Sequence, residues 1–406
     1  MSSSFGLLRL PRSVTFASGA VTALPRQVAD TGRRAAICVD PALAQTPAFR
    51  HAHQGIRASG VATMLITDVH PELPIESVHR AAAALAGFEP DLVVGYGGGS
   101  SLDLAKLLAL LAVHDRPLPD FYGENKVPGP VLPVIAVPTT AGTGSEATPV
   151  AVLTDPSREL KVGVSSPHLV PHAAIVDPAL TLGAPPPVIA YAGADALVHA
   201  VEAATAIRPE RRLDDRLPVF VGENDLGTPL ALIAVRHLTE NLSAAVTRPD
   251  DLAPREGLAL GSLLAGMAFG TAGTHLSHAI QYPVGAMTST PHGLGTGMLL
   301  PYVLEAILPD ATARVAAVGR AMNVTGEDET SLARAAIARI RQILQSIGVP
   351  RTLAEIGLAE AALPRVTELA CGVTRLAGNS PVGAEPDLVE SIVRAAFAGT
   401  TGRWER

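Results

Sequence analysis

The stretch VVGYGGGSSLDLAK, residues 93–106, indicates how the first half of the chain folds. Its first residues are typical of a buried strand, and the segment 101–114 carries apolar residues at helical spacing. The residues at the junction are Gly97, Gly98, Gly99 and Ser100. Glycines let a backbone approach a diphosphate closely, and the N–H groups that begin a helix favour its negative charge. An ordinary strand-to-helix turn is the alternative, because Leu102 stands where the G-x-G-x-x-G pattern has its last glycine.

Strand-like and helical segments alternate on both sides of this loop. Short apolar runs, several rich in β-branched residues, occur at 35–39, 62–67, 91–95 and 134–137. Helix-length patterns lie between them, at 75–87 and 101–114. This alternation predicts parallel βαβ units. We therefore expect residues 1–183 to form an α/β dinucleotide-binding domain with a parallel, Rossmann-like sheet.

The strand pattern ends near Leu180, and the rest of the chain is typical of helices. Helix-length patterns cover 191–205, 230–246, 255–270, 331–347 and 387–398. The boundary lies in LTLGAPPPV, residues 180–188, where three consecutive prolines should interrupt regular structure and leave an extended connector. We therefore expect residues 184–406 to form a separate, all-α domain.

A second glycine loop follows the strand-like residues 134–137. PTTAGTGSEAT, residues 138–148, combines two glycines with five small hydroxyl residues, so its amides and hydroxyls could bind a diphosphate or a nicotinamide amide. A Ser/Thr-capped turn is the alternative. Asp40 ends the run AAICVD, where a carboxylate can accept hydrogen bonds from ribose hydroxyls and repel a 2′-phosphate. Unless Asp40 only caps the next turn, this position favours NAD over NADP.

Four side chains of the second half could bind one metal ion. In GADALVHAVEA, Asp195 and His199 are four residues apart on a predicted helix and project from one face. Alone, such a pair is more often a hydrogen-bonded surface pair. THLSHAIQYPVGAMTSTPHGLG, residues 274–295, adds His278 and His292, and one carboxylate with three imidazoles suits Fe(II) or Zn(II). His275 lies near them in the sequence, but we expect it to be a hydrogen-bonded structural histidine and not a metal ligand.

These motifs together resemble the iron-containing (group III) alcohol dehydrogenases. GGGSSLDLAK, PTTAGTGSE, VDPALTLGAPP, GADALVHAVEA and HAIQYPVGAMTSTPHGLG occur in that family's order and span nearly the whole chain. The resemblance implies a dinucleotide-binding domain followed by a helical, dehydroquinate synthase-like domain. It also places four residues on the family's metal-ligand positions: Asp195, His199, His278 and His292. It further suggests a homodimer.

The resemblance extends to the cofactor positions and has one departure. It implies that the NAD-binding residues are Asp40, Gly97, Gly98, Gly99, Ser100, Asp103, Thr139, Thr140, Thr143 and Lys161, although a solvated surface lysine is the alternative for the last. Many members carry a histidine, proposed to move the alcohol proton, where this chain has Tyr282. A phenol with a pKa near ~10 is a poorer proton acceptor at neutral pH than imidazole. The segments HLSHAIQYP and FVGEN (residues 220–224) resemble the hydroxyacid-oxoacid transhydrogenase branch of the family more than its other members.

The expected activity is reversible hydride transfer between a small alcohol or hydroxy acid and NAD. A bound metal would polarise the substrate oxygen, so no strong side-chain base is needed there and Tyr282 can be tolerated. Two alternatives remain: a transhydrogenase that acts on 4-hydroxybutyrate with NAD kept bound, and a non-catalytic nucleotide or metal sensor. The charged segment RPERRLDDR, residues 208–216, is typical of a solvated loop, but its arginines could attract a carboxylate-bearing substrate.

Composition excludes several other classes of protein. The 406 residues carry 31 basic and 38 acidic side chains without a dense basic segment, which argues against nucleic acid as a partner. Two cysteines, Cys38 and Cys371, are too few for a disulfide framework or a thiolate zinc site. The chain shows neither an apolar signal segment nor an apolar run of about 20 residues. We therefore expect a cytoplasmic protein without a membrane partner.

Overall fold

The computed structural model describes residues 4–400, which divide into two compact units. One unit is Arg9–Ala184, and the other combines residues 185–400 with residues 4–8. The short N-terminal segment is attached to the second unit by hydrogen bonds to Asp225. The Phe5 N–H donates to Asp225 Oδ2 (2.9 Å), and the Asp225 N–H donates to the Phe5 carbonyl (2.8 Å).

The unit Arg9–Ala184 is built on a six-stranded sheet in which every strand pair is parallel. In spatial order the strands are β1 (Ser13–Phe16), β9 (Ala173–Val176), β6 (Val134–Pro138), β4 (Leu92–Gly97), β2 (Arg34–Val39) and β3 (Ala62–Ile66). The direction in which successive strands are placed in the sheet reverses between β2 and β4: β3 lies on the far side of β2, whereas β6 and β9 lie on the far side of β4. Ligands of α/β sheets usually bind beyond the carboxyl ends of strands at such a point. Asp40 follows β2 here, and the first glycine loop follows β4.

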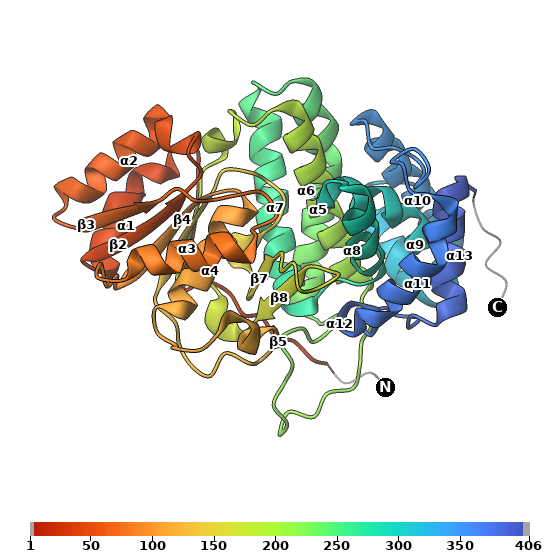
Figure 1. Ribbon diagram of the computed structural model, residues 1–406. Coiled ribbons are helices and arrows are strands. Elements are labelled where there is room, and N and C mark those ends of the chain that lie inside the picture. Colours follow the sequence, from red (N-terminus) through yellow and green to blue (C-terminus); the bar gives the residue numbers. More distant parts are fainter. Residues whose placement is uncertain (1–3, 401–406) are drawn as a thin grey trace. The chain divides into compact units, whose positions relative to one another are not determined.

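Helices cover both faces of this sheet (Figure 1). α1 (Leu24–Thr31) and α2 (Pro47–Ala58) pack on one face with side chains such as Val94. α3 (Ile75–Leu85) and α4 (Gly99–Leu111) pack on the other face with side chains such as Val93. Because both faces are buried, all six residues of β4 are buried. This explains why the sequence shows continuous apolar runs instead of alternation.

The predicted parallel α/β architecture is confirmed, but the sequence missed several elements of it. Four strands and two helices fall where we expected them: β2, β3, β4, β6, α3 and α4. The missed elements are β1, β9, α1, α2 and a small second sheet. The strands of that sheet are β5 (Gly123–Glu124), β8 (Val162–Ser165) and β7 (Val150–Leu153). β7 lies beside α4.

The second unit is helical, as predicted (Figure 1). Its helices of ten or more residues are α5 (Pro186–Thr205), α6 (Gly227–Thr247), α7 (Leu252–Ala272), α8 (Leu276–Thr288), α9 (His292–Ala321), α10 (Glu329–Ser346), α11 (Leu363–Gly372) and α13 (Pro386–Ala398). A shorter helix, α12 (Thr374–Ala377), lies between α11 and α13. α5 packs against α6, α7 and α9, so it is buried on nearly all sides.

The extended connector expected at residues 180–188 is wrong, because residues 180 and 181 end a 3-10 helix, residues 182–184 form a turn, and α5 begins directly after Pro185. Pro185 is the N-cap of α5, and Pro186 and Pro187 form the first turn of that helix. A proline is tolerated there because the first N–H groups of a helix have no partner within it, and the proline ring already has a helical φ. The prolines therefore start a helix instead of preventing one.

A search of the described residues for membrane spans finds no single helix that is long and apolar enough. The pair α7 and α8 meets the length and composition criteria only when taken together, across a bend of 101°.

Candidate metal centre and cofactor loops

One buried helix supplies the carboxylates of the candidate metal centre. α5 carries Asp195, His199 and Glu202 on one face, at positions i, i+4 and i+7. These side chains are almost completely buried, with residue exposures of 4%, 5% and 0%. Buried carboxylates are costly unless they are paired or bind a metal. The burial of these three side chains therefore indicates a metal or ion-pair site and not a solvated surface pair.

Two further helices begin at the centre, and each brings a histidine to it. α8 follows the bend after α7, where Gly273 has a φ of 83°, and places His278 in its first turn. α9 begins at His292 itself. The next residue, Gly293, allows a close approach to α5, because a Cβ there would overlap the Tyr191 carbonyl oxygen and lie 2.8 Å from the Cβ of Asp195. Bulkier residues at this position would hold His292 away.

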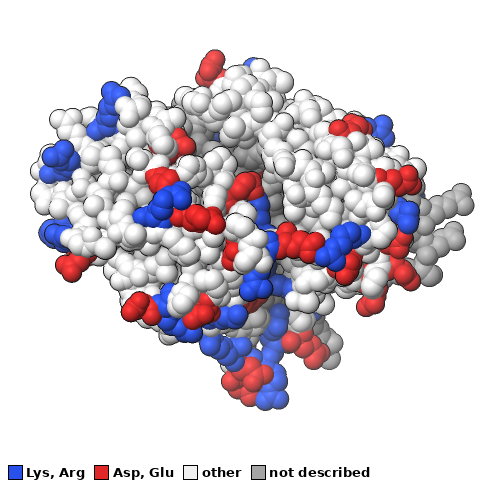
Figure 2. Space-filling model, in the orientation of Figure 1, with Lys and Arg blue, Asp and Glu red and all other residues white. Residues whose placement is uncertain are grey.

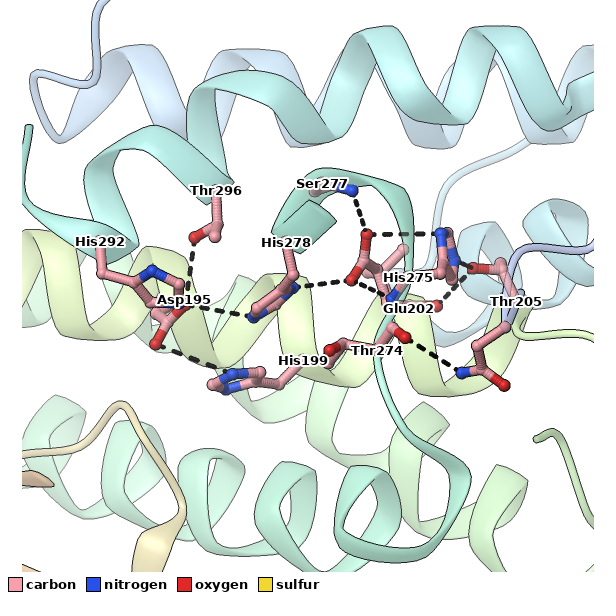
Figure 3. A network of polar contacts seen from close by, with 12 residues as sticks. Asp195, His199, Glu202, Thr205, Thr274, His275, Ser277, His278, His292 and Thr296 are labelled. Carbon is pink, nitrogen blue, oxygen red and sulfur yellow. Dashed lines mark hydrogen bonds and ion pairs between the residues drawn. The ribbon is translucent and has the colours of Figure 1, made fainter. Parts of the chain in front are cut away.

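The structure brings Asp195, His278 and His292 into one cluster, with one ligand atom of each within 4.8 Å of the others (Figure 3). Asp195 Oδ1 lies 3.8 Å from His278 Nε2 and 3.7 Å from His292 Nε2. His199 stands beside this cluster, with its Nε2 3.8 Å from Asp195 Oδ2. These separations are too long for hydrogen bonds. They approach the value of about 3.4 Å between two ligands bound to one tetrahedral ion.

The hydrogen bonding of His278 fits a metal ligand. Its Nδ1 lies 2.7 Å from Glu202 Oε2, and since that carboxylate can only accept, Nδ1 carries the proton. Its Nε2 is buried and has no hydrogen-bond partner among the described residues. The lone pair of that nitrogen therefore faces the cluster, as metal binding requires.

Glu202 is the functional residue that the sequence interpretation missed. Its carboxylate accepts hydrogen bonds from the backbone N–H groups of His275 and Ser277, each 2.7 Å long, in addition to the one from His278 (Figure 3). Burial alone would raise the pKa of Glu202, but His275, His278 and these hydrogen bonds hold the pKa well below its usual range. Glu202 thus fixes the start of α8 and the orientation of His278 together. Its i+7 spacing from Asp195 was the available signal.

Asp195 is held in its ionised form by its surroundings. Burial alone would raise its pKa, but His199, His292 and His278 and the hydroxyl of Thr296 lower it. Thr296 Oγ1 donates to Asp195 Oδ1 over 3.1 Å from the first turns of α9. An ionised carboxylate is the form that binds a cation.

Aromatic rings surround the histidines of the centre. His199 stacks on Phe269 with ring centroids 4.0 Å apart, and its ring also lies 4.9 Å from that of His278. Tyr282, one turn after His278 on α8, has its ring 6.1 Å from that of His292. Tyr282, which stands where many family members have a proton-moving histidine, is therefore close to the ligands.

His275 lies outside the cluster. Its Nε2 is 3.0 Å from Thr205 Oγ1, and its Nδ1 is 3.4 Å from Glu202 Oε1. The residue is fully buried, and burial lowers its pKa. His275 therefore helps to connect α8 to α5, as expected for a structural histidine.

The two glycine loops lie against each other in the other unit. The first connects β4 directly to α4, and Gly97 has a φ of 152°, a conformation that favours glycine. The Thr139 N–H donates to the Gly97 carbonyl over 2.9 Å. A Cβ on Gly98 would meet the Thr140 side chain at 3.5 Å, and a Cβ on Gly99 would meet Thr143 at 2.8 Å. The loops predicted to bind one diphosphate thus form one surface.

The remaining predicted cofactor residues occupy different surroundings. Asp40 follows β2, and its Oδ1 accepts a hydrogen bond of 2.7 Å from the Ala42 N–H, as in a capped turn. Lys161 forms an ion pair with Glu72. Asp103 is partly buried on α4, where its carboxylate oxygens accept hydrogen bonds from Ser145 Oγ (2.6 Å) and the Val152 N–H (2.9 Å).

The charged segment 208–216 pairs three of its four arginines within its own unit. Arg208 binds Asp225 at 2.6 Å, and Arg212 binds Asp214 at 2.7 Å. Arg211 donates to the Val221 carbonyl over 2.9 Å. Most of the face drawn in Figure 2 is uncharged, and where charged side chains occur on it, basic and acidic ones often lie next to each other. A carboxylate-bearing substrate would have to compete with these acidic partners.

Comparisons with known proteins match both halves of the chain. A family model described as iron-containing alcohol dehydrogenase matches residues 11–178. The model of the C-terminal region of the Fe-containing alcohol dehydrogenase family matches residues 189–397. The second match includes the whole candidate metal centre, from Asp195 to His292.

Similar proteins cover nearly the full length of the chain. Long-chain-alcohol dehydrogenase 1 of Geobacillus thermodenitrificans is 36% identical over 388 residues, which are 94% of each chain. The NAD-dependent methanol dehydrogenase of Bacillus methanolicus is 30% identical over 389 residues, 95% of this chain and 98% of the other. A crystal structure of 1,3-propanediol oxidoreductase has a TM-score of 0.89 and 29% identity, with 97% of this chain and 100% of that one covered. Fold, metal cluster and both family models agree, and the chain belongs to the iron-containing alcohol dehydrogenase family of oxidoreductases that act on CH–OH groups.

Proposed function

We propose that the protein is a metal-dependent alcohol dehydrogenase that transfers hydride reversibly between a small primary alcohol or hydroxy acid and NAD. The observation that carries the proposal is the convergence of Asp195, His278 and His292, with His278 Nε2 buried and without a hydrogen-bond partner. In this proposal residues 1–183 bind NAD, and residues 184–406 hold the metal and the substrate. The similarity to the NAD-dependent methanol dehydrogenase of Bacillus methanolicus supports NAD as the cofactor.

The metal would be held by Asp195, His199, His278 and His292, and we propose Fe(II), with Zn(II) as the alternative. When bound, the ion would act as a Lewis acid that polarises the substrate oxygen. Asp195 supplies the negative charge, since its surroundings keep its pKa low. Glu202 keeps the proton of His278 on Nδ1 and thereby keeps Nε2 able to bind.

NAD would be bound by the two glycine loops, Asp40 and Lys161. The amides of Gly98, Gly99 and Ser100 begin α4, so a diphosphate there would meet N–H groups and the positive end of the helix dipole. Thr139, Thr140 and Thr143 would add hydroxyls from the second loop. When bound, NAD would accept the hydride from the alcohol carbon, and NADH would return it to an aldehyde.

Tyr282 would contribute to the substrate side of the centre. Its ring lies near that of His292, so its hydroxyl is a candidate for moving the alcohol proton. Because the metal would already polarise the substrate oxygen, we expect this contribution to be modest.

The test is NADH formation at 340 nm by the Fe(II)-loaded protein with primary alcohols, diols and 4-hydroxybutyrate. His278→Ala is the control, and we expect NADH formation by the wild type to be lost in it. Oxidation of 4-hydroxybutyrate only after addition of 2-oxoglutarate, with no free NADH, would instead indicate a transhydrogenase. Silence of the wild type in both assays would contradict catalysis and favour a sensor. Sedimentation equilibrium would test the homodimer that the family resemblance supports.

A further inference from the structure

We propose that Asp103 and Lys106 form a clamp that holds the second glycine loop against the first and thereby sets the affinity for NAD. The proposal rests on NAD being the cofactor, as proposed above. It assigns Asp103 a positioning role in place of direct contact with the cofactor. It also gives a role to Lys106, which the expected chemistry does not use.

Asp103 binds the second loop at two points. Its Oδ1 accepts from Ser145 Oγ over 2.6 Å, and its Oδ2 accepts from the Val152 N–H over 2.9 Å. Ser145 ends the glycine-containing part of the loop, and Val152 lies in β7. Both carboxylate oxygens therefore already have donors from the protein. A charged acceptor makes such bonds stronger than those of a neutral one.

Lys106 binds the same segment between these two points. Its Nζ donates to the carbonyl oxygens of Thr148 (2.9 Å) and Val150 (2.8 Å) and to Thr148 Oγ1 (3.3 Å). The side chain has an exposure of 0%, an exceptional environment for a lysine. Burial lowers its pKa to about 8, although Asp103 and Glu146 oppose this. A buried ammonium with three acceptors is a fixed attachment and not a mobile surface charge.

The position of the two residues on α4 makes them act together. Asp103 and Lys106 are three residues apart, so they lie on one face of α4 and both reach the segment 145–152. The same helix begins with the first glycine loop. One rigid element therefore carries the first loop at its start and holds the end of the second loop on its side.

The second loop is consequently fixed at both ends. At its start the Thr139 N–H donates to the Gly97 carbonyl, and at its end Ser145 donates to Asp103. Between these points Thr143 lies so close to Gly99 that a Cβ there would meet it at 2.8 Å. Ordering a loop at the moment of binding lowers affinity, so a loop that is already fixed binds NAD more tightly.

The experiment uses full-length, metal-loaded Asp103→Asn and Lys106→Met, with Leu110→Ala as the matched control. Like Lys106, Leu110 is fully buried on α4, but it packs in the core of the unit. NAD dissociation constants are measured by calorimetry, together with metal content, melting temperature and the KM for the alcohol at saturating NAD. Ser145→Ala removes only one hydroxyl of the clamp, so it keeps the test open if the first two variants fold poorly.

We expect the Kd for NAD to rise at least 10-fold in Asp103→Asn and Lys106→Met and about 3-fold in Ser145→Ala. Metal content and the KM for the alcohol should stay unchanged. Leu110→Ala should lower the melting temperature but leave the Kd within 2-fold. Variants that melt earlier yet bind NAD like the wild type would overturn the clamp alone. A wild type without saturable NAD binding would overturn the proposed function and the clamp with it.

Discussion

Replacing Glu202 by glutamine keeps the shape of the side chain but changes its hydrogen bonding at the metal centre. The carboxylate accepts at Oε2 from the His275 N–H and from His278 Nδ1, and at Oε1 from the Ser277 N–H. A glutamine amide offers one oxygen and one NH2 group, which only donates. Each of its two orientations therefore creates a conflict.

With the amide oxygen in place of Oε1, the NH2 group faces His278 Nδ1. That nitrogen can then only accept, so the His278 proton moves to Nε2, the atom that faces Asp195. The ring is then unable to bind a metal through Nε2. With the oxygen in place of Oε2, the NH2 group opposes the Ser277 N–H, and His278 keeps its tautomer but has a neutral partner.

Both orientations lead to a measurable loss. A buried donor left without an acceptor destabilises the fold by about 1–3 kcal/mol. Loss of the carboxylate partner of a ligating histidine lowers metal affinity by roughly 10- to 100-fold, or about 1.4–2.7 kcal/mol. Glu202→Gln should therefore bind metal more weakly and also unfold at a lower temperature.

The assay is competition with a coloured chelator for Zn(II), and for Fe(II) under anaerobic conditions, with the melting temperature of the metal-free protein measured in parallel. Thr205→Val is the control, because Thr205 is buried on the same helix and contacts His275, but not His278, through its hydroxyl. It should lose stability and keep its metal affinity. If Glu202→Gln bound metal as tightly as the wild type, the tautomer argument would be refuted.

Three further predictions concern other parts of the chain. Gly293→Ala should destabilise the protein by more than about 2 kcal/mol in urea unfolding and weaken metal binding, because its Cβ would overlap the Tyr191 carbonyl oxygen, whereas Gly183→Ala, which meets nothing within 4 Å, should be neutral. Burial raises the pKa of the Glu146 carboxyl group from 4.5 to about 7, so the folded state binds a proton there more tightly than the unfolded state does. The free energy of unfolding therefore falls as the pH rises from about 4.5 to about 7. Relative to Glu146→Gln, the wild type should therefore lose on the order of 1–3 kcal/mol between pH 4.5 and pH 7.5, and parallel profiles of the two proteins would contradict this. Tyr282→Phe should bind metal normally and lower kcat by about 10-fold or less, while a loss near 1,000-fold would mean that its hydroxyl carries the proton.

Local sequence patterns predicted those strands and helices whose own residues carry a clear apolar pattern. The central strands β2 and β4 are buried on both faces, so their apolar runs are visible without knowledge of the fold. The four-residue strands β1 and β9 were missed, because each depends on pairing with a partner distant in the chain. The prediction of a connector at the three prolines was wrong for a different reason. Proline destabilises the interior of a helix but is tolerated in its first turn, and that is where these prolines lie.

The candidate site divides in the same way. Asp195 and His199 share one helix turn, so their proximity follows from spacing alone. Glu202 lies on the same helix, but its role depends on the start of α8, more than 70 residues later, and no local pattern shows that contact. Asp103 was expected to touch the cofactor because the family resemblance implied it. Its bonds to Ser145 and Val152 depend on how that helix packs.

The junction at Glu202 has a consequence for how the protein acquires its metal. Glu202 on α5 binds His278 Nδ1 and the two backbone N–H groups at the start of α8, so these contacts within the polypeptide orient the ligand. Metal loading would then be a late and reversible step, in contrast to zinc fingers, which fold only when loaded. A chelator should strip the ion without unfolding the chain, and the stripped protein should accept whichever divalent ion is supplied. The resident metal in a cell would then follow the available pool of ions.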